Sequence, residues 1–311
     1  MTTGIKNFMI CGVGFCYLLV SGLFPLNAAQ QYPVEGSWEM VIQTVVKQPV
    51  RMAAFLDEHF GVTGGFSGSG KTHVTTDGGQ TWTKTESSGG CIFGVEIVDK
   101  ELVWVCGKMM GMSFSTPGGI RLSKDGGRSF EHQANFQTSP KECPMGFLGE
   151  KTGWVYQEGR LSATADGGQN WQTLPLPEEV TKIKAVSPLS VEEGYILDET
   201  GIVFVTKDQG QTWESLPLPR NEFAGKEAAR LEGTTAGLRF FDRENGLAVM
   251  SLVGDEAPVI MAFRTSDGGR NWQVELVDQG MGSIFLSPDG SFITSSLREI
   301  KVYRYRAEER N

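Results

Sequence analysis

One eight-residue pattern recurs five times along this chain of 311 residues. Each copy has Ser or Thr first, Asp third, Gly fifth and an aromatic residue eighth. The copies are Thr75–Trp82, Ser123–Phe130, Thr164–Trp171, Thr206–Trp213 and Thr265–Trp272. Successive aspartates are 48, 41, 42 and 59 residues apart, a spacing that indicates one repeated structural unit rather than unrelated domains.

The chemistry of the octamer favours a tight turn between two strands. A short Asp side chain accepts hydrogen bonds from N–H groups a few residues later, and Gly supplies the positive φ of such a turn. The aromatic residue begins the next strand and is expected to be buried between neighbouring sheets, where it stabilises packing. We therefore predict structural roles for ten residues: Asp77, Trp82, Asp125, Phe130, Asp166, Trp171, Asp208, Trp213, Asp267 and Trp272.

The residues before each octamer complete a unit of four strands. Seven residues before the Asp, four copies have a glycine suited to the turn between the second and third strands: Gly70, Gly118, Gly159 and Gly201. Alternating apolar segments further upstream are typical of a first strand, a polar turn and a second strand. After the fifth octamer three strands remain, and residues 36–45 supply the missing fourth. The sequence predicts an all-β propeller of six four-stranded blades closed by an N-terminal strand, with seven blades as the alternative.

The first residues predict the compartment. Residues 1–29 contain one Lys, an apolar run from Phe8 to Phe24, then Pro25 and small residues, as in a secretory signal peptide. An uncleaved membrane anchor is the alternative, because 17 apolar residues approach the length that spans a bilayer. We expect residues 30–311 to form a single soluble domain outside the cytoplasm, in a periplasm, a thylakoid lumen or the medium.

Composition and short motifs exclude several classes of function. The balance of 28 basic against 37 acidic residues argues against a nucleic-acid surface. The segment Gly65–Thr72 matches a phosphate-binding loop, but Gly70 is the recurring turn glycine and no helix follows, so we expect no nucleotide. The three histidines lack metal-ligand spacing, and we expect neither metal nor cofactor. Cys91 and Cys106 flank a predicted hairpin and could form a disulfide, although the sequence does not fix the register.

The octamer resembles the Asp-box, or bacterial neuraminidase repeat. In families with this repeat the boxes form the outer turns between the third and fourth strands, away from the ligand face. Sialidases among them need three arginines that bind the substrate carboxylate, a Tyr/Glu nucleophile pair and an Asp that acts as acid and base. No such set is identifiable here. Tyr303 and Tyr305 fit alternating strand positions, and the acid pairs Asp57/Glu58, Glu192/Glu193 and Asp198/Glu199 fit solvated turns. We therefore expect no catalytic residues and no enzymatic activity.

The run of motifs around the first unit resembles the photosystem II stability/assembly factor family and its bacterial relatives. Trp38, the string AAFLDEHFGVTGG and the box TTDGGQTW carry this resemblance. It implies a non-enzymatic propeller that binds a membrane or exported protein as an assembly or stability factor. The chain departs from that family in having six predicted blades rather than seven, no arginine-rich patch and no lipid site. A carbohydrate-active or carbohydrate-binding propeller of the sialidase superfamily is the alternative.

Segments that differ between the units are candidates for contact with a partner. The connector 108–116 holds four residues suited to adaptable protein contact: Met109, Met110, Met112 and Phe114. A loop that folds onto its own blade is the alternative interpretation. The insertion Asn221–Gly233 predicts a short helix between the fourth and fifth blades.

Overall fold

The computed structural model describes residues 36–46, 50–65, 72–85, 91–108, 118–135, 142–219, 226–228, 235–254 and 257–307. They belong to one compact unit, Val34–Asn311. The predicted signal segment, Lys71 and the four Met and Phe residues of the 108–116 connector lie outside the described residues. Within the described ranges, no helix is long and apolar enough to cross a membrane.

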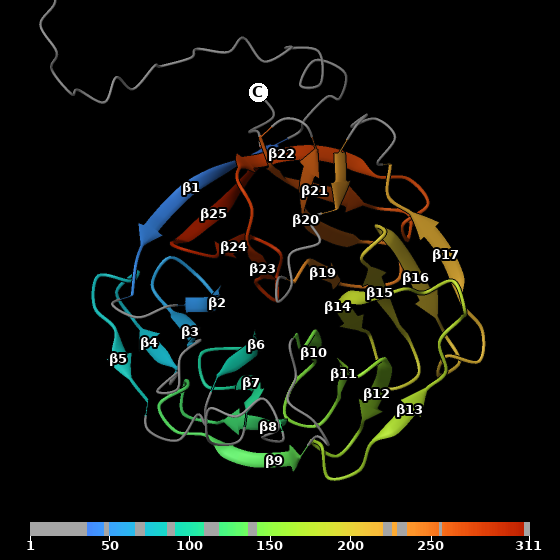
Figure 1. Cartoon of the computed structure of the whole chain (residues 1–311), viewed down its shortest axis with the longest axis horizontal. Helices are drawn as coiled ribbons and strands as arrows, with labels where there is room; N and C mark the ends of the chain where they lie inside the picture. Colours follow the sequence, from blue (N-terminus) through green and yellow to red (C-terminus); the bar gives the residue numbers. More distant parts are fainter. Residues whose placement is uncertain are drawn as a thin grey trace, which may run out of the picture. The chain divides into compact units, whose positions relative to one another are not determined.

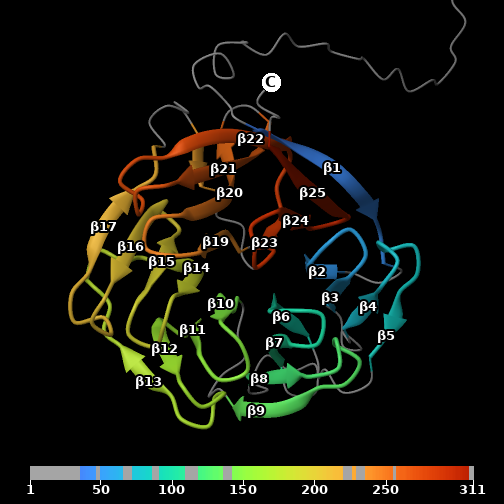
Figure 2. The same cartoon turned by 180° about the vertical axis from the view of Figure 1, so that it is seen from behind.

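The described residues form six antiparallel sheets around a central axis, as Figure 1 shows. Each sheet is a blade whose strands follow one another from the axis to the rim, and Figure 2 shows the same order from behind. Blade 1 contains β2 (Val50–Phe55), β3 (Gly61–Gly65), β4 (His73–Thr75) and β5 (Thr83–Lys84). Blade 2 contains β6 (Ile92–Ile97), β7 (Val103–Lys108), β8 (Gly118–Ser123) and β9 (Glu131–Asn135).

The next two blades have the same plan, and the fifth has one strand more. Blade 3 contains β10 (Met145–Phe147), β11 (Gly153–Gln157), β12 (Arg160–Thr164) and β13 (Gln172–Leu174). Blade 4 contains β14 (Ile183–Pro188), β15 (Gly194–Asp198), β16 (Ile202–Thr206) and β17 (Glu214–Pro217). Blade 5 contains β18 (Lys226–Ala228), β19 (Gly237–Phe240), β20 (Gly246–Gly254), β21 (Val259–Thr265) and β22 (Gln273–Gln279).

The N-terminal strand closes the sixth blade. This blade contains β23 (Ser283–Leu286), β24 (Phe292–Ser296), β25 (Ile300–Ala307) and β1 (Gly36–Thr44). β1 pairs antiparallel with β25, with Trp38 opposite Tyr305. The predicted closure is confirmed, and so is the six-bladed propeller. The alternative of seven blades is wrong, because β18 and the long hairpin β20–β21 occupy the 59-residue interval.

The short helix predicted within Asn221–Gly233 is contradicted where the structure describes that segment. Lys226–Ala228 is strand β18, paired antiparallel with residues 252–254 of β20. β19 covers β20 only as far as Val249, so the rest of β20 offers unpaired backbone groups. Pairing with those groups outweighs the local preference for a helix.

Hydrogen bonds between blades satisfy N–H groups at the inner edges of the sheets. At the closing seam, the N–H groups of Ala53 and Phe55 in blade 1 donate to the hydroxyls of Ser296 and Thr294 in blade 6, each at 3.0 Å. These bonds join the first complete blade to the last. The ring therefore closes through side chains on the axis side as well as through β1 at the rim.

Aromatic side chains fill the spaces between blades. The Trp104 ring of β7 stacks on Phe147 of β10 in the next blade, with centroids 3.9 Å apart. Gly153 pairs with Phe147, and a Cβ there would lie 2.2 Å from the ring. The glycine is thus required by the close approach of the ring.

One disulfide links two blades and differs from the pairing considered from the sequence. Cys106 of β7 is bonded to Cys143, which lies two residues before β10. Cys106 pairs in register with Gly94, whereas the carbonyl of Cys91 accepts the N–H of Lys108. The bridge therefore joins blade 2 to blade 3 instead of crossing the hairpin of blade 2.

Candidate functional site

The propeller has two faces with different construction. The turns between first and second strands and the Asp-box turns between third and fourth strands lie at one end of each blade, which we call the box face. The turns between second and third strands, and the connectors from each fourth strand to the next blade, lie at the other end, the connector face.

The box carboxylates are used by the turns themselves. Asp77 accepts a hydrogen bond from the Thr75 hydroxyl at 2.7 Å, from the Thr81 N–H at 2.9 Å and from the Thr81 hydroxyl at 2.6 Å. The bonds from Thr81 lower the pKa of Asp77 to about 2. Bonds from the backbone and side chain of Asn271 likewise lower the pKa of Asp267 to about 2. These carboxylates are therefore ionised at neutral pH.

Each box also holds the neighbouring turn of its own blade. The N–H of Gly78 donates to the carbonyl of His59, and the same contact recurs in every blade that has a box. In the fourth box Gln209 replaces the first glycine and adopts a positive φ of 61°. The bonds are Gly78 to His59, Gly126 to Glu101, Gly167 to Lys151, Gln209 to Glu192 and Gly268 to Glu244.

The box aromatics pack at the rim rather than deep in the core. Phe130 is buried, whereas the four box tryptophans are half-buried. The Trp171 indole donates to the carbonyl of Gly168, and the Trp213 indole donates to Pro175 of the preceding blade, both at 2.9 Å. Fully buried tryptophans occur instead on second strands, at Trp104 and Trp154. Trp82 and Trp272 still reach inward, and their rings lie edge-on to Phe55 and Phe240 of the first strands.

Net negative charge is concentrated on the box face. The five boxes and the six turns between first and second strands hold fifteen acidic and seven basic residues. They account for most of the chain's net charge of −9. The connector face is thus closer to neutral, and it carries the segments whose length and sequence differ between blades.

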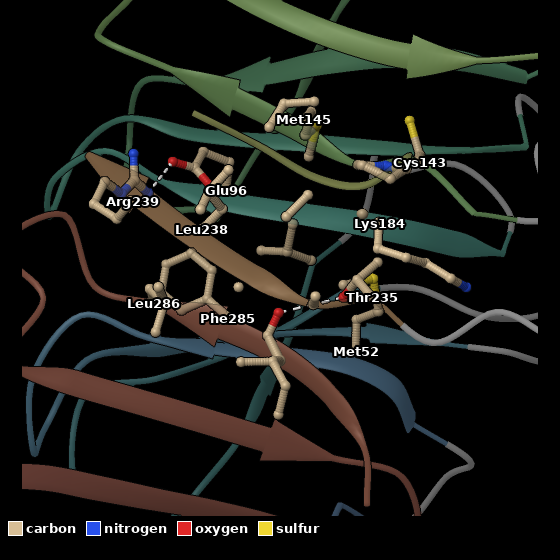
Figure 3. A pocket seen from close by; sticks show the side chains of 18 residues that line it. Met52, Glu96, Cys143, Met145, Lys184, Thr235, Leu238, Arg239, Phe285 and Leu286 are labelled. Carbon is tan, nitrogen blue, oxygen red and sulfur yellow. Dashed lines mark hydrogen bonds and ion pairs between the residues drawn. The ribbon is translucent and has the colours of Figure 1, made fainter. Parts of the chain in front are cut away.

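A small cavity lies on the axis of the propeller, and Figure 3 shows the residues that line it. First strands of all six blades line a cavity of about 40 Å³ there. Glu96 and Arg239 point toward one another across it and form an ion pair of 2.6 Å. Because small-molecule sites commonly have volumes of about 300–1,000 Å³, this cavity is too small to be a substrate site.

A second ion cluster lies at the connector-face end of the axis. Buried Glu142 pairs with Lys182 at 2.9 Å and with buried Lys184 at 3.0 Å. The adjacent residue, Cys143, carries the interblade disulfide. These contacts fasten the segment before β10 to β14 of the next blade.

A larger cavity, of about 270 Å³, lies on the connector face between blades 5 and 6. We call it the blade 5/6 cleft, and its lining includes Asp278, Gly280, Met281, Leu297, Arg298, Lys301 and Tyr303. Asp278 accepts the Tyr303 hydroxyl at 2.6 Å and the Lys301 ammonium at 2.9 Å. Burial raises the pKa of Asp278, but the bonds from Tyr303 and Lys301 outweigh it and hold that pKa below its ordinary value.

Tyr303 is therefore a poor candidate for a nucleophile. Burial, and then its bond to the Asp278 carboxylate, raise the pKa of its hydroxyl far above the ordinary value. The hydroxyl stays protonated and donates to Asp278. This hydrogen bond holds the Asp278 and Tyr303 side chains in place in the cleft and supplies no phenolate at neutral pH.

A further cavity of about 310 Å³ on the box face combines aromatic and amide side chains, as carbohydrate sites do. Phe241 and Trp272 contribute its aromatic surface. The Asn271 amide, however, donates to Asp267 at 2.6 Å, and the amide of Asn245 donates to Asp242 at 2.8 Å. These amide donors are engaged within the protein.

Two of the acid pairs are not solvated as expected. Asp198 is buried and accepts bonds from the N–H groups of Thr200 and Ile202 within its turn. Glu193 is bonded to Arg243 through both carboxylate oxygens, at 2.9 Å and 2.7 Å. Arg243 is 50 residues from Glu193, so the sequence around Glu193 gave no sign of this partner. Among the residues that the structure describes, no three His, Cys, Asp or Glu side chains are grouped as metal ligands.

Comparison with known proteins places the fold in a family. The family model of the photosynthesis system II assembly factor YCF48 matches residues 128–304, more than half of the chain. The chain belongs to the YCF48 family. A BNR/Asp-box repeat model matches residues 73–84, which include the first box. No curated protein matches the sequence.

The chain is similar to several solved structures. "YCF48 bound to D1 peptide" is 19% identical with a TM-score of 0.48, and the alignment covers 86% of this chain and 96% of that one. The WD40 repeats of RRP9 are 7% identical with a TM-score of 0.54, covering 87% and 98% of the two chains. The GH74 xyloglucanase from Xanthomonas campestris is 15% identical with a TM-score of 0.51, covering 86% of this chain and 53% of the enzyme. At these identities the likeness to RRP9 and the xyloglucanase shows the fold alone.

The YCF48-family match contains the blade 5/6 cleft. Both walls of the blade 5/6 cleft lie within residues 128–304. So do Cys143 and Arg239, whose partners Cys106 and Glu96 precede the match. The sequence singled out the 108–116 connector and missed the cleft, although the adjacent Leu297 and Arg298 in a short turn offered a signal.

Proposed function

We propose that this protein is a non-enzymatic, extracytoplasmic propeller that binds another protein and acts as an assembly or stability factor. The match of the YCF48 family model over residues 128–304 carries the proposal. A solved YCF48 is described as bound to a D1 peptide. We extend only the class of partner, a polypeptide of a membrane or exported protein, to this chain.

Two observations support a location outside the cytoplasm. The disulfide between Cys106 and Cys143 is of the kind that persists in oxidising compartments. The apolar run Phe8–Phe24 at the N-terminus has the composition of a secretory signal. An oxidised disulfide in protein isolated from its native source supports this location, and reduced Cys106 and Cys143 contradict it.

Binding is assigned to the connector face. On the box face, carboxylates and amides are used in the turns that hold each blade together. On the connector face, the connectors differ from blade to blade and the blade 5/6 cleft is open. Variation on a rigid scaffold is the usual arrangement for recognition by loops.

The test is affinity capture with crosslinking from the extracytoplasmic fraction of the source. The protein should retain a membrane or exported polypeptide, and Ala at Met109, Met110, Met112 and Phe114 should weaken capture without lowering the Tm. Lys207→Ala, an exposed box-face change, is the matched control. Turnover of a sialoside or of xyloglucan by the purified protein, or capture that is equal for all variants, contradicts the proposal.

A further inference from the structure

The blade 5/6 cleft lies beside a part of blade 5 that extends beyond the usual blade length. Past the end of β19, residues 252–254 of β20 pair with β18 and with the start of β21. Ile260 of β21 pairs with Asp278 of β22, and both line the cleft. The opposite wall is the turn Leu297–Glu299 between β24 and β25. The cleft therefore lies between strands β21 and β22 of blade 5 and the β24–β25 turn of blade 6.

The size of the cleft suits side chains of a polypeptide. Its volume of about 270 Å³ is far larger than the space that one water needs, and it lies just below the range of small-molecule sites. Leu297 is 41% exposed beside it, and Met281 is half-buried in its lining. Gly280, with φ of 136°, has no heavy atom within 4 Å of the position that a Cβ would occupy. A partner backbone can approach there.

Arg298 is the charged residue of the cleft for which the described ranges contain no ion pair. Lys301 is paired with Asp278 at 2.9 Å and with Glu299 at 3.6 Å, and Glu299 also accepts the Gln43 amide at 2.8 Å. Arg298 is exposed, and over the described ranges it forms no ion pair. The acidic groups of the cleft are thus compensated, whereas the Arg298 guanidinium is available to an added carboxylate.

We propose that the blade 5/6 cleft binds an extended segment of the partner polypeptide in which an apolar side chain stands next to a carboxylate. The apolar side chain packs on Leu297 and Met281, and the carboxylate pairs with Arg298. This inference rests on the proposed function and names the partner's chemistry at one place on the connector face. The carboxylate is that of an Asp or Glu side chain within the segment.

Fluorescence anisotropy with labelled synthetic decapeptides tests this assignment. The first peptide has Leu-Leu-Asp at its centre and an amidated C-terminus, and the second ends in Leu-Leu with a free carboxylate. In the third and fourth, Asn or Lys replaces the Asp of the first. The Asn peptide should bind about fivefold more weakly than the first, as expected for one exposed ion pair, and the Lys peptide more weakly still. Tighter binding of the second peptide than of the first would contradict the assignment of the carboxylate to a side chain.

Variants locate the binding. Arg298→Glu should weaken binding of the Leu-Leu-Asp peptide about tenfold, Leu297→Ser should weaken it severalfold, and Arg298→Lys should retain most of the affinity. Lys207→Glu, a charge reversal on the box face, should bind like the wild type. An unchanged Tm in each variant shows that the fold is intact, and the Arg298→Lys variant separates loss of charge from loss of structure.

Three outcomes would overturn the cleft assignment. They are no binding of either carboxylate peptide by the wild type at millimolar concentration, equal binding of the Asp and Lys peptides, and indifference to Arg298→Glu and Leu297→Ser. If the native partner is still captured in those cases, only the cleft assignment fails. If the wild type captures no polypeptide at all, the proposed function fails as well.

Discussion

The carboxylate of Glu96 lies 2.6 Å from the guanidinium of Arg239, and this ion pair bridges the axis of the propeller from blade 2 to blade 5. Both side chains project from innermost strands, and both are almost fully buried. Burial raises the pKa of Glu96 above its ordinary value, although the charge of Arg239 opposes this effect. The pair therefore connects opposite sides of the ring where the blades come closest together.

Removing one partner of this pair should destabilise the fold strongly. Arg239→Met leaves the Glu96 carboxylate buried without its cation, and we expect a loss of about 3 to 5 kcal/mol in the free energy of unfolding. The double variant Glu96→Leu/Arg239→Met should lose less than Arg239→Met alone, since no charge remains buried. Urea unfolding measures both.

An exposed pair provides the control for this comparison. Lys124 and Glu150 form an ion pair on the box face with about half of each side chain exposed, so Lys124→Met should cost at most about 1 kcal/mol. Equal stability of the Arg239→Met and Lys124→Met variants would show that the axial pair contributes nothing special.

The interblade disulfide should contribute measurably to stability. Cys106 and Cys143 are 37 residues apart, and closing a loop of that length in the unfolded chain corresponds to about 4 kcal/mol. Cys143→Ser should therefore lower the midpoint of urea unfolding. Reducing agent should lower the midpoint of the wild type but not that of the variant. Cys91→Ser is the control and should leave the reductant effect intact. Peptide mapping that recovers a bridge between Cys91 and Cys106 would refute the assignment.

The box carboxylates predict how stability depends on acid. The folded-state pKa values of Asp77 and Asp267 are lowered to about 2 from an ordinary value of 3.8. A lowered folded pKa adds stability that is fully present above the ordinary value and is lost as the pH falls through the folded one. The free energy of unfolding should thus decline between about pH 4 and pH 2.

A substitution separates this effect from general acid unfolding. Asp77→Asn removes one titrating carboxylate, so the variant should be less stable at pH 7 and should lose less stability between about pH 4 and pH 2. Urea unfolding at a series of pH values measures the slope. A slope identical to that of the wild type would mean that the box carboxylates do not drive the acid sensitivity.

Much of the architecture could be predicted because the octamer fixes the register of five of the six blades. Once the turn between third and fourth strands is located, the upstream glycines and alternating segments place the other strands. The missing fourth strand of blade 6 then required an N-terminal partner, and β1 pairs with β25 as predicted. The register, with Trp38 opposite Tyr305, could not be derived from the sequence. Local turn chemistry and the number of repeats were sufficient to predict the arrangement of the blades.

Contacts between blades could not be predicted in the same way. Glu96 and Arg239 are 143 residues apart and look like ordinary charged positions in strands. Cys143 lies in a connector, so its pairing with Cys106 depends on how blade 3 packs on blade 2. β18 forms because β20 extends past β19, a fact about strand length that no local pattern contains. Predicting the blade 5/6 cleft would have required both how these blades pack and how far the strands of blade 5 extend.

The tryptophans provide the last prediction, because their position in the blade should determine their contribution to stability. Trp104, on the second strand of blade 2, is fully buried and stacked on Phe147. Trp171, in the third box, is half-buried at the rim. Trp104→Ala should therefore cost about 3 to 5 kcal/mol, whereas Trp171→Ala should cost about half as much. Urea unfolding of the two variants, followed by circular dichroism, measures the difference. Equal losses would show that the box aromatics contribute to the core as fully as the second-strand aromatics do.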